Sequence, residues 1–323
     1  MKVFIPKLDQ FVREDHPYRK ILELVDFKEL TQALQEEYSS RGRGGYPVDT
    51  GFKCLLLQYT EDLSDRELER FLQENLAGKL FCGFGLDETT PDFSYFSVLR
   101  KRIGTSHLAD LFNRVRESLK EGGLIREIFT FVDATQLVSK LSTWEERDKA
   151  IKAGLDRFNN AVAEQIARDK EARFGCKGKD KFWYGYKKQI SVDMRHGLIN
   201  KVAVTKANLP DHKGLKNVCP HQGMVLADKG YCPKEGQQAV AKRGCHSGII
   251  LKDNMIGKDR DKDRWLTRLR MPFEGTFSKD GHRARYQGIA KNQFQAFMEA
   301  LAFNLKRLVK IEAPPISLVP VKG

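Results

Sequence analysis

Two short apolar runs in this sequence each end on an aspartate, and two carboxylates brought together can bind a metal ion. Residues 128–132 (IFTFV) precede Asp133, and residues 224–227 (MVLA) precede Asp228. Apolar, β-forming residues on both faces predict buried strands. A carboxylate at the end of such a strand is costly unless a cation or a hydrogen-bond donor meets it. If the two strands are neighbours, their ends lie about 5 Å apart, so Asp133 and Asp228 would meet.

Other readings of single acids stay open. Taken alone, Asp133 is more simply a turn or helix-cap residue, since Asp-Ala-Thr favours a turn. Asp193 also follows a predicted strand, but it precedes a hairpin turn, where Asp is ordinary.

Glu274 is the third candidate acid. It follows Met271-Pro272, and Pro is favoured in the first turn of a helix. We therefore expect a helix that begins near Glu274, with Arg270 at or before its start. Arg270 and Glu274 are four residues apart, so Arg270 could pair with Glu274 or reach a phosphate.

The three acids together suit divalent metals. Carboxylates crowded at one point repel each other without a cation, and Mg²⁺ or Mn²⁺ suits hard oxygen ligands. Two such ions about 3.5–4 Å apart activate an attacking oxygen and stabilise a leaving one in phosphoryl transfer. We expect two Mg²⁺ or Mn²⁺ ions on Asp133, Asp228 and Glu274, with the carboxylates as ligands rather than nucleophiles.

The N-terminal part is predicted to be helical. Apolar residues recur at helical spacing between Tyr18 and Tyr38, and further helices are expected at 51–60, 65–75, 93–102 and 107–124. Ser64 with Glu67 three residues later is a capping box. The arrangement resembles a helix-turn-helix bundle, and the basic run 100–102 fits either phosphate contacts or the charge preference of a helix C-terminus.

The C-terminal part alternates strands and helices. After the strand that ends at Asp133, a charged helical insertion is expected at about 143–180. Strands are then predicted at 186–193, 198–205, 224–228 and 248–251, and helices at 211–218, 233–243 and 292–311. This order matches the RNase-H-like fold, an α/β fold with a mixed sheet that places its acids on adjacent central strands and a later helix.

The composition favours a nucleic-acid partner and gives no sign of a membrane. Lys and Arg number 56 against 43 Asp and Glu, a net charge of +13, and such an excess favours a polyanion. No apolar run approaches the ~18 residues of a membrane span, and the N-terminus lacks a signal-peptide pattern. We expect a cytoplasmic protein. The six cysteines form no Cys-x-x-Cys pair, so a zinc module is disfavoured.

The chain resembles bacterial insertion-sequence DDE transposases of the IS-five-like group. The motifs that carry the resemblance span nearly the whole chain: 44–47 (GGYP), 63–68 (LSDREL), 81–84 (FCGF), 131–135 (FVDAT), 228–231 (DKGY) and 283–291 (RARYQGIAK). Near the last acid the family signature also has a Tyr and a Lys. Thr267 and Gly281 stand at those positions here, although Arg270 and Glu274 keep their spacing.

The resemblance implies a domain division and a reaction. Residues 1–124 would form a helical DNA-binding domain and 125–313 the RNase-H-like catalytic domain, with 314–323 as a tail. The enzyme would cut transposon-end DNA and join the released 3′-hydroxyl to target DNA, as a nucleoid-associated homodimer or larger assembly. We assign DNA contacts to the following residues: Arg100, Lys101, Arg102, Lys187, Lys229, Tyr231, Arg270, Arg283, Arg285 and Lys291.

Two alternatives share these features. One is an inactive transposase-derived DNA-binding protein or repressor, and the other is a metal-dependent nuclease without strand transfer. Tyr231 and Trp265 also have two interpretations, as packing residues or as platforms on which an unpaired base stacks.

Overall fold

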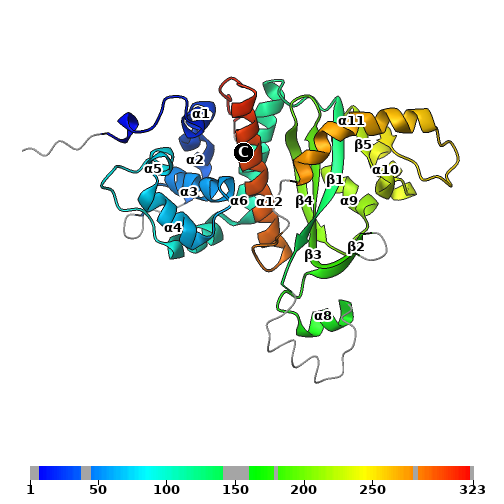
Figure 1. Cartoon of the computed structure of the whole chain (residues 1–323), viewed down its shortest axis with the longest axis horizontal. Helices are drawn as coiled ribbons and strands as arrows, with labels where there is room; N and C mark the ends of the chain where they lie inside the picture. The colour runs from blue at the N-terminus through cyan, green and yellow to red at the C-terminus, as the bar shows by residue number, and fades with distance from the viewer. Residues whose placement is uncertain (1–6, 38–44, 141–159, 178–180, 279–282, 321–323) are drawn as a thin grey trace, which may run out of the picture. The chain divides into compact units, whose positions relative to one another are not determined.

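The computed structural model (Figure 1) describes residues 7–37, 45–140, 160–177, 181–278 and 283–320. The chain divides into two compact units, one formed by Met1–Leu124 with Phe297–Gly323 and the other by Ile125–Ala296. Residues 297–313, which the sequence analysis placed in the catalytic domain, therefore belong to the helical unit. The reason is that the helix over these residues buries Met298, Leu301 and Leu305 among apolar side chains.

The first unit is a bundle of helices around α3. Its elements are η1 (Leu8–Gln10), α1 (Pro17–Leu24), α2 (Phe27–Glu37), α3 (Val48–Thr60), α4 (Asp65–Glu74), α5 (Leu76–Cys82), α6 (Phe93–Glu121) and the later part of α12 (Ile289–Lys310). Nearly every residue of α3 is buried, and α2, α4, α5 and α6 pack around it. An apolar helix buried on all sides is the natural centre of a bundle.

Local capping explains where several of these helices begin. Ser64 and Glu67 form the predicted capping box at the start of α4. The single helix expected between Tyr18 and Tyr38 is instead two helices, because Asp26 accepts hydrogen bonds from the backbone N–H groups of Lys28 and Glu29 and starts α2 afresh. α6 is interrupted at Gly104, whose φ of 64° and ψ of 172° are not helical. This break separates the two helices that the sequence predicts there.

The second unit is built on a six-stranded mixed sheet. Its strands are β1 (Phe129–Val138), β2 (Arg173–Lys177), β3 (Lys181–Asp193), β4 (Leu198–Lys206), β5 (Met224–Ala227) and β6 (His246–Ile249). The order is β2-β3-β1-β5-β6, with β4 also paired to β3. β3 is antiparallel to β1, β2 and β4, whereas β5 is parallel to β1 and β6 is parallel to β5. This combination of antiparallel strands with two further parallel ones forms the RNase-H-like sheet that the sequence predicts.

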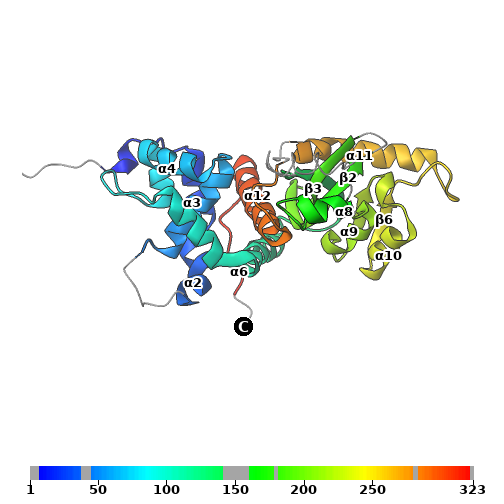
Figure 2. The ribbon, with the colours of Figure 1, turned by 90° about the horizontal axis from the view of Figure 1, so that it is seen from below.

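Helices cover both faces of this sheet (Figure 2). α9 (Asp211–Val218) packs on β1, β3 and β4, and α10 (Lys234–Lys242) packs on α9 and β6. α11 (Arg260–Ser278) packs on β1 from the opposite side. Gly214 permits the close approach of α9, because a Cβ there would come within 1.7 Å of the buried Gln189 side chain.

The predicted helical insertion differs from the structure at its end. A short helix, α8 (Asn160–Ile166), lies within it, but residues 173–177 form β2 and pair with the start of β3. Pairing with β3, the next strand in the sequence, therefore overrides the helical pattern. Residues 143–159 and 178–180 lie outside the described part of the chain.

Asp193 stabilises the start of β1 rather than serving a site. Its side chain is 1% exposed. One carboxylate oxygen accepts the backbone N–H groups of Arg126 and Glu127, at 3.0 and 2.9 Å, and the other accepts that of Arg195 at 3.0 Å. This carboxylate joins the segment before β1 to the β3–β4 turn, as expected for a turn residue.

Replacing Asp193 by Ala is expected to lower the free energy of unfolding by about 3 kcal/mol, since three backbone donors are left without their acceptor. Urea unfolding followed by circular dichroism measures the change. Asp261→Ala is the matched control, because the Asp261 side chain is 88% exposed and its removal should cost no more than about 0.5 kcal/mol. Equal stability of the two variants would contradict the structural role of Asp193.

Candidate active site

The pairing of β1 with β5 brings Asp133 and Asp228 to the same level of the sheet. The parallel register runs from Phe129 opposite Met224 to Phe131 opposite Leu226. Each aspartate lies two residues beyond the last pair, and adjacent strands are about 4.8 Å apart. The two carboxylates therefore belong to one edge of the sheet, as the apolar runs predict.

Asp133 is not at the end of its strand, which corrects the sequence analysis. β1 continues to Val138 because its antiparallel pairing with β3, with Asp133 opposite Ile190, persists after β5 has ended. Asp133 thus occupies a central strand at the point where one neighbouring strand ends. Its side chain is half-buried at this point.

The environment of Asp133 opposes its negative charge. Its pKa is raised from 3.8 to about 6: desolvation is the largest cause and the charge of Asp228 adds to it, against lowering by the Ala134 backbone N–H and by Lys177 and Arg270. A divalent cation would offset both the missing solvation and the repulsion. The carboxylate pair therefore fits a hard metal ion.

Asp228 is exposed and held by the turn that follows β5. Its carboxylate accepts the backbone N–H of Gly230 at 2.8 Å and so caps the short helix η2 (Lys229–Tyr231). The cap fixes the orientation of the side chain at the sheet edge. The tight turn after Asp228 is therefore enough to hold this carboxylate at the edge of the sheet.

α11 begins much earlier than the sequence predicts. It runs from Arg260 to Ser278, so Arg270 lies inside it, Pro272 interrupts its hydrogen bonding, and Glu274 is well past its first turns. The cause is Asp259, whose carboxylate accepts the backbone N–H groups of Asp261 and Lys262 at 2.9 and 3.0 Å. This N-cap starts the helix upstream of the proline. The Glu274 side chain lies outside the described part of the structure.

Arg270 lies against the central strand. It is 9% exposed, and its guanidinium carbon is 5.2 Å from the centre of the Phe131 ring. Its charge acts on both Asp133 and Tyr231. Arg270 is therefore placed to balance the carboxylates from within the helix that carries Glu274.

Among the described residues, no three His, Cys, Asp or Glu side chains are close enough to form a complete metal site. Asp133 and Asp228 supply two oxygen ligands, and oxygen donors suit Mg²⁺ or Mn²⁺ rather than zinc. The six cysteines are free thiols.

The structure separates the basic residues of the catalytic unit into exposed and internal groups. Lys229, Arg283 and Lys291 are exposed, although Lys229 pairs with Asp253 at 3.3 Å. Arg285 is half-buried. Lys187 is half-buried, and its ammonium group contacts Asp211 at 2.7 Å and the carbonyl oxygen of Leu209 at 2.9 Å. An internal partner therefore accounts for Lys187, whereas the exposed residues remain accessible to DNA.

Tyr231 cannot stack on a DNA base: of its two interpretations the structure supports packing, and the DNA contact assigned to it is wrong. Its side chain is 1% exposed and packs in a cluster with Val132, Leu215 and Val218. The turn after Asp228 directs this ring into the space between α9 and α10. The other aromatic candidate, Trp265, is 49% exposed on α11.

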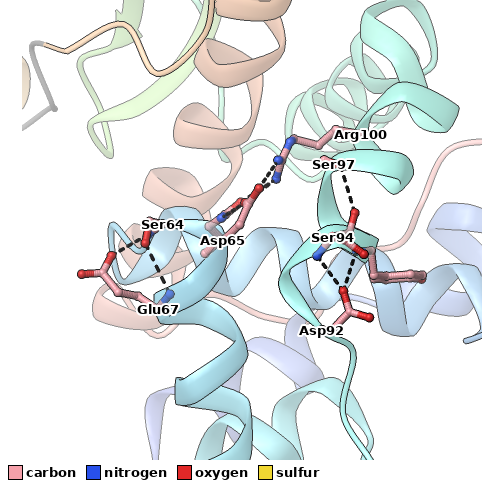
Figure 3. A network of polar contacts seen from close by, with 9 residues as sticks. Ser64, Asp65, Glu67, Asp92, Ser94, Ser97 and Arg100 are labelled. Atoms are coloured by element: carbon pink, nitrogen blue, oxygen red, sulfur yellow. Dashed lines mark hydrogen bonds and ion pairs between the residues drawn. The ribbon is translucent and has the colours of Figure 1, made fainter.

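Arg100 in the helical unit is also engaged internally (Figure 3). Its guanidinium group contacts both carboxylate oxygens of Asp65, at 2.8 and 2.5 Å, and the side-chain oxygen of Gln58 at 3.2 Å. The pair links α6 to the start of α4. Lys101 and Arg102 are exposed on α6.

Two features near the acids are missed by the sequence analysis. Lys188 is 1% exposed on β3, where it lies opposite Thr135. Side chains alternate between the two faces of a strand, so Lys188 lies on the same face of β3 as Ile190 and Val192. This alternation in the sequence is the signal that could have identified a lysine on an apolar face.

Asp211, at the start of α9, is also close to Asp228, since a Cβ on Gly230 would be 3.0 Å from Asp228 and 3.6 Å from Asp211. Only the tertiary structure brings these two acids together.

A mixed sheet of this order, with Asp133 and Asp228 at one edge of two adjacent central strands, defines an RNase-H-like fold. The model of the family described as "Transposase DDE domain" matches residues 129–305, and that of "Transposase domain (DUF772)" matches residues 6–102. Since the first match spans more than half of the chain, the protein belongs to the DDE transposase family.

One solved structure is similar over 98% of this chain and 80% of its own, with a TM-score of 0.42 and 8% identity. It is a piggyBac transposase in a synaptic complex with hairpin DNA. None of the helices in the described residues is long and apolar enough to cross a membrane.

Replacing Arg100 by Met is expected to lower the stability of the helical unit by about 2 kcal/mol, because it leaves the partly buried Asp65 without its partner. Lys101→Met and Arg102→Met should change stability by no more than about 0.5 kcal/mol. Each should instead lower the slope of log affinity for DNA against log salt concentration by about one, because one phosphate is no longer neutralised.

Urea unfolding and DNA-binding titrations at several salt concentrations measure the two effects. An Arg100→Met variant that is as stable as the wild type but binds DNA weakly would restore Arg100 to the DNA interface.

Proposed function

We propose that this chain is a metal-dependent transposase that cuts the ends of a transposon and joins the released 3′-hydroxyl to target DNA. The observation that carries the proposal is the shared level of Asp133 and Asp228 on the parallel strands β1 and β5. The raised pKa of Asp133 supports it, because a bound cation would relieve that carboxylate. Membership of the DDE transposase family agrees with it.

Asp133, Asp228 and Glu274 would hold two Mg²⁺ or Mn²⁺ ions. Bound ions would polarise the scissile phosphate and lower the pKa of the attacking water. The carboxylates orient these ions and form no covalent bond to DNA. Arg270, buried beside Phe131, balances the negative charge of the acids before DNA arrives.

Both units would contribute DNA contacts. In the helical unit the exposed Lys101 and Arg102 of α6 are suited to phosphates, and in the catalytic unit Lys229, Arg283 and Lys291 are exposed. These contacts would make binding strongly salt-dependent. Joining two transposon ends requires at least two active sites, so we propose a homodimer or larger assembly on DNA.

Substituting Asp133→Asn, Asp228→Asn or Glu274→Gln is expected to reduce cleavage about 10³-fold or more while DNA affinity stays within about threefold of the wild type. The neutral amide keeps the shape of each side chain but removes the charge that holds the metal. Gel assays of end cleavage and filter binding measure the two quantities. Asp253→Asn is the control, since the Asp253 side chain is 79% exposed and its contacts are with Lys229 and Lys258 rather than with the three acids.

Strand transfer is tested separately with pre-cleaved ends that carry a free 3′-hydroxyl. Joined products in Mg²⁺ or Mn²⁺ support the transposase. Cleavage without joining indicates a nuclease, and binding without either reaction indicates a DNA-binding protein or repressor. Near-normal cleavage by one of the three acid variants would remove that residue from the site.

A further inference from the structure

A cavity of about 520 Å³ lies beside the start of β1. Three segments of the catalytic unit line it: the residues around the start of β1, the β3–β4 turn and the C-terminal half of α11. Its lining includes neither Asp133 nor Asp228. The volume is within the range of about 300–1,000 Å³ that is typical of ligand-binding sites. The proposed chemistry at the acids makes no use of this cavity.

Apolar side chains form much of the lining, and two of them are aromatic. Phe129 and Phe273 line the cavity together with Ile128, Met194 and Pro272. Ile128 and Phe129 are 56% and 39% exposed, although both are large apolar residues. Apolar surface gathered in one place and left in water marks a region that binds another molecule.

Three arginines give the cavity a positive charge. Arg126, Arg195 and Arg268 belong to the lining, one from each of the three segments, and all three are exposed. Asp193 also lines the cavity, but its carboxylate is buried and accepts three backbone N–H groups. A cleft lined by charges of one sign attracts a ligand of the opposite sign. The lining therefore selects a ligand that carries negative charge beside an apolar group.

The position of the cavity favours DNA as the source of that charge. Side chains alternate along β1, so Phe129 lies on the same face of the sheet as Phe131 and Asp133. α11 covers this face, since it packs on β1 and its Arg270 lies against Phe131. Phe129 and Asp133 are four residues apart, or about 13 Å along the strand. A DNA strand rises about 3.4 Å per nucleotide, so about four nucleotides separate the cavity from a phosphate at Asp133.

A nucleotide combines the two properties that the lining selects. Its base is a flat ring that stacks on aromatic side chains, and its phosphate pairs with arginine. Proteins that bind single-stranded DNA use this combination of positive charge and aromatic rings. A base inside a duplex is stacked and cannot enter a cavity, so the nucleotide has to be unpaired. A second copy of this chain docked through the same surface suits the cavity less, because it would bring arginines against arginines.

We propose that this cavity binds an unpaired nucleotide of the DNA substrate, with the base against the two phenylalanine rings and the neighbouring phosphates on the three arginines. The inference rests on the proposed function for the identity of the substrate as DNA, and not on the metal site. It gives the chain a subsite for single-stranded DNA within about four nucleotides of the acids. A base held there would fix the register of the strand relative to Asp133 and Asp228.

The test measures binding of the full chain to single-stranded DNA in EDTA, so that metal chemistry plays no part. The probe is a fluorescein-labelled strand of about 12 thymidines, followed by fluorescence anisotropy. Phe129→Ala should weaken binding of this strand about 5–100-fold, because a stacked base loses its platform. Its affinity for a duplex should stay within about twofold of the wild type, since duplex binding depends on phosphate contacts. Arg268→Gln should lower the slope of log affinity for the single strand against log salt concentration by about 0.7, the effect of losing one phosphate contact.

Two substitutions of the same kind outside the cavity are the matched controls. Phe182→Ala removes a phenylalanine that is 68% exposed on β3, and Arg264→Gln removes a guanidinium group that is 66% exposed on α11. Neither residue lines the cavity, so both variants should bind the thymidine strand as the wild type does. Phe129→Trp keeps an aromatic ring and should retain the affinity that Phe129→Ala loses, which distinguishes lost stacking from lost folding.

A second probe separates the base from the backbone. It has the same length but carries abasic tetrahydrofuran residues in place of the thymidines. The wild type should bind it as weakly as Phe129→Ala binds the thymidine strand, and Phe129→Ala should weaken its binding no further. Equal wild-type affinity for the two probes would show that phosphates alone hold the strand and would overturn the inference. A loss of duplex affinity in Phe129→Ala as large as its loss of single-strand affinity would do the same.

The acid variant Asp133→Asn keeps this test apart from that of the proposed function. If Asp133→Asn abolishes end cleavage while Phe129→Ala binds the thymidine strand as the wild type does, the proposed function stands and the inference is wrong. The cavity then fits another anionic occupant, such as an acidic segment of a partner protein. If Phe129→Ala loses affinity but the wild type neither cleaves nor joins DNA in Mn²⁺, the subsite stands and the proposed function fails.

Discussion

The pairing of β1 with β5 is the constraint on which the site depends. Parallel hydrogen bonding stops at Phe131 and Leu226, and the chain then carries a carboxylate on each strand two residues further on. The backbone ladder thus forces together two groups that repel each other. The pKa of Asp133 rises from 3.8 to about 6 in the folded chain, which corresponds to about 3 kcal/mol against its charged form. Because the folded pKa lies above the unfolded one, protonation of Asp133 favours the folded state: this gain is fully present below pH 3.8 and is lost as the pH rises through 6, so the charged carboxylate is an unfavourable term at neutral pH.

The unfavourable charge of Asp133 has to be offset by other interactions of the sheet. Buried hydrogen bonds at the start of β1 stabilise the same strand. Asp193 and Glu127 are both buried there, and the carboxylate oxygens of both residues accept hydrogen bonds. Glu127 accepts the side-chain amide of Asn200 at 2.7 Å and the backbone N–H of His221 at 3.1 Å. These bonds join β1 to β4 and to the loop before β5. The two strands that lead to the candidate acids Asp133 and Asp228 are therefore fixed at the end away from those acids.

The sequence predicts the parts of this structure that local chemistry determines. The capping box at Ser64, the β3–β4 hairpin, helix 211–218 and the apolar runs before Asp133 and Asp228 depend on near neighbours, and the structure contains all of them. The continuation of β1 beyond Asp133 could not be predicted from the sequence, because the length of β1 is set by its pairing with β3, which lies far along the chain. Proline is a strong local signal, so the start of α11 was expected near Pro272, whereas the Asp259 cap acts well upstream of it.

Charged and aromatic side chains are harder to assign, because their roles depend on distant partners. Arg100 belongs to a basic run that suits DNA, but Asp65, on another helix, occupies its guanidinium group. Tyr231 lies three residues after the candidate acid Asp228, but its ring is directed into the core. Basic or aromatic character alone therefore does not identify a DNA contact.

The number of hydrogen bonds that each carboxylate accepts distinguishes the structural acid Asp193 from the candidate acids Asp133 and Asp228. Asp193 is buried, and its two oxygens accept three backbone N–H groups. Asp133 and Asp228 each accept one backbone N–H among the described residues, and both lie where the parallel pairing has ended. All three follow apolar strand residues in the sequence, so strand pattern cannot distinguish them. Unused acceptor sites, together with the raised pKa of Asp133, favour Asp133 on β1 and Asp228 just after β5 as the candidate metal ligands.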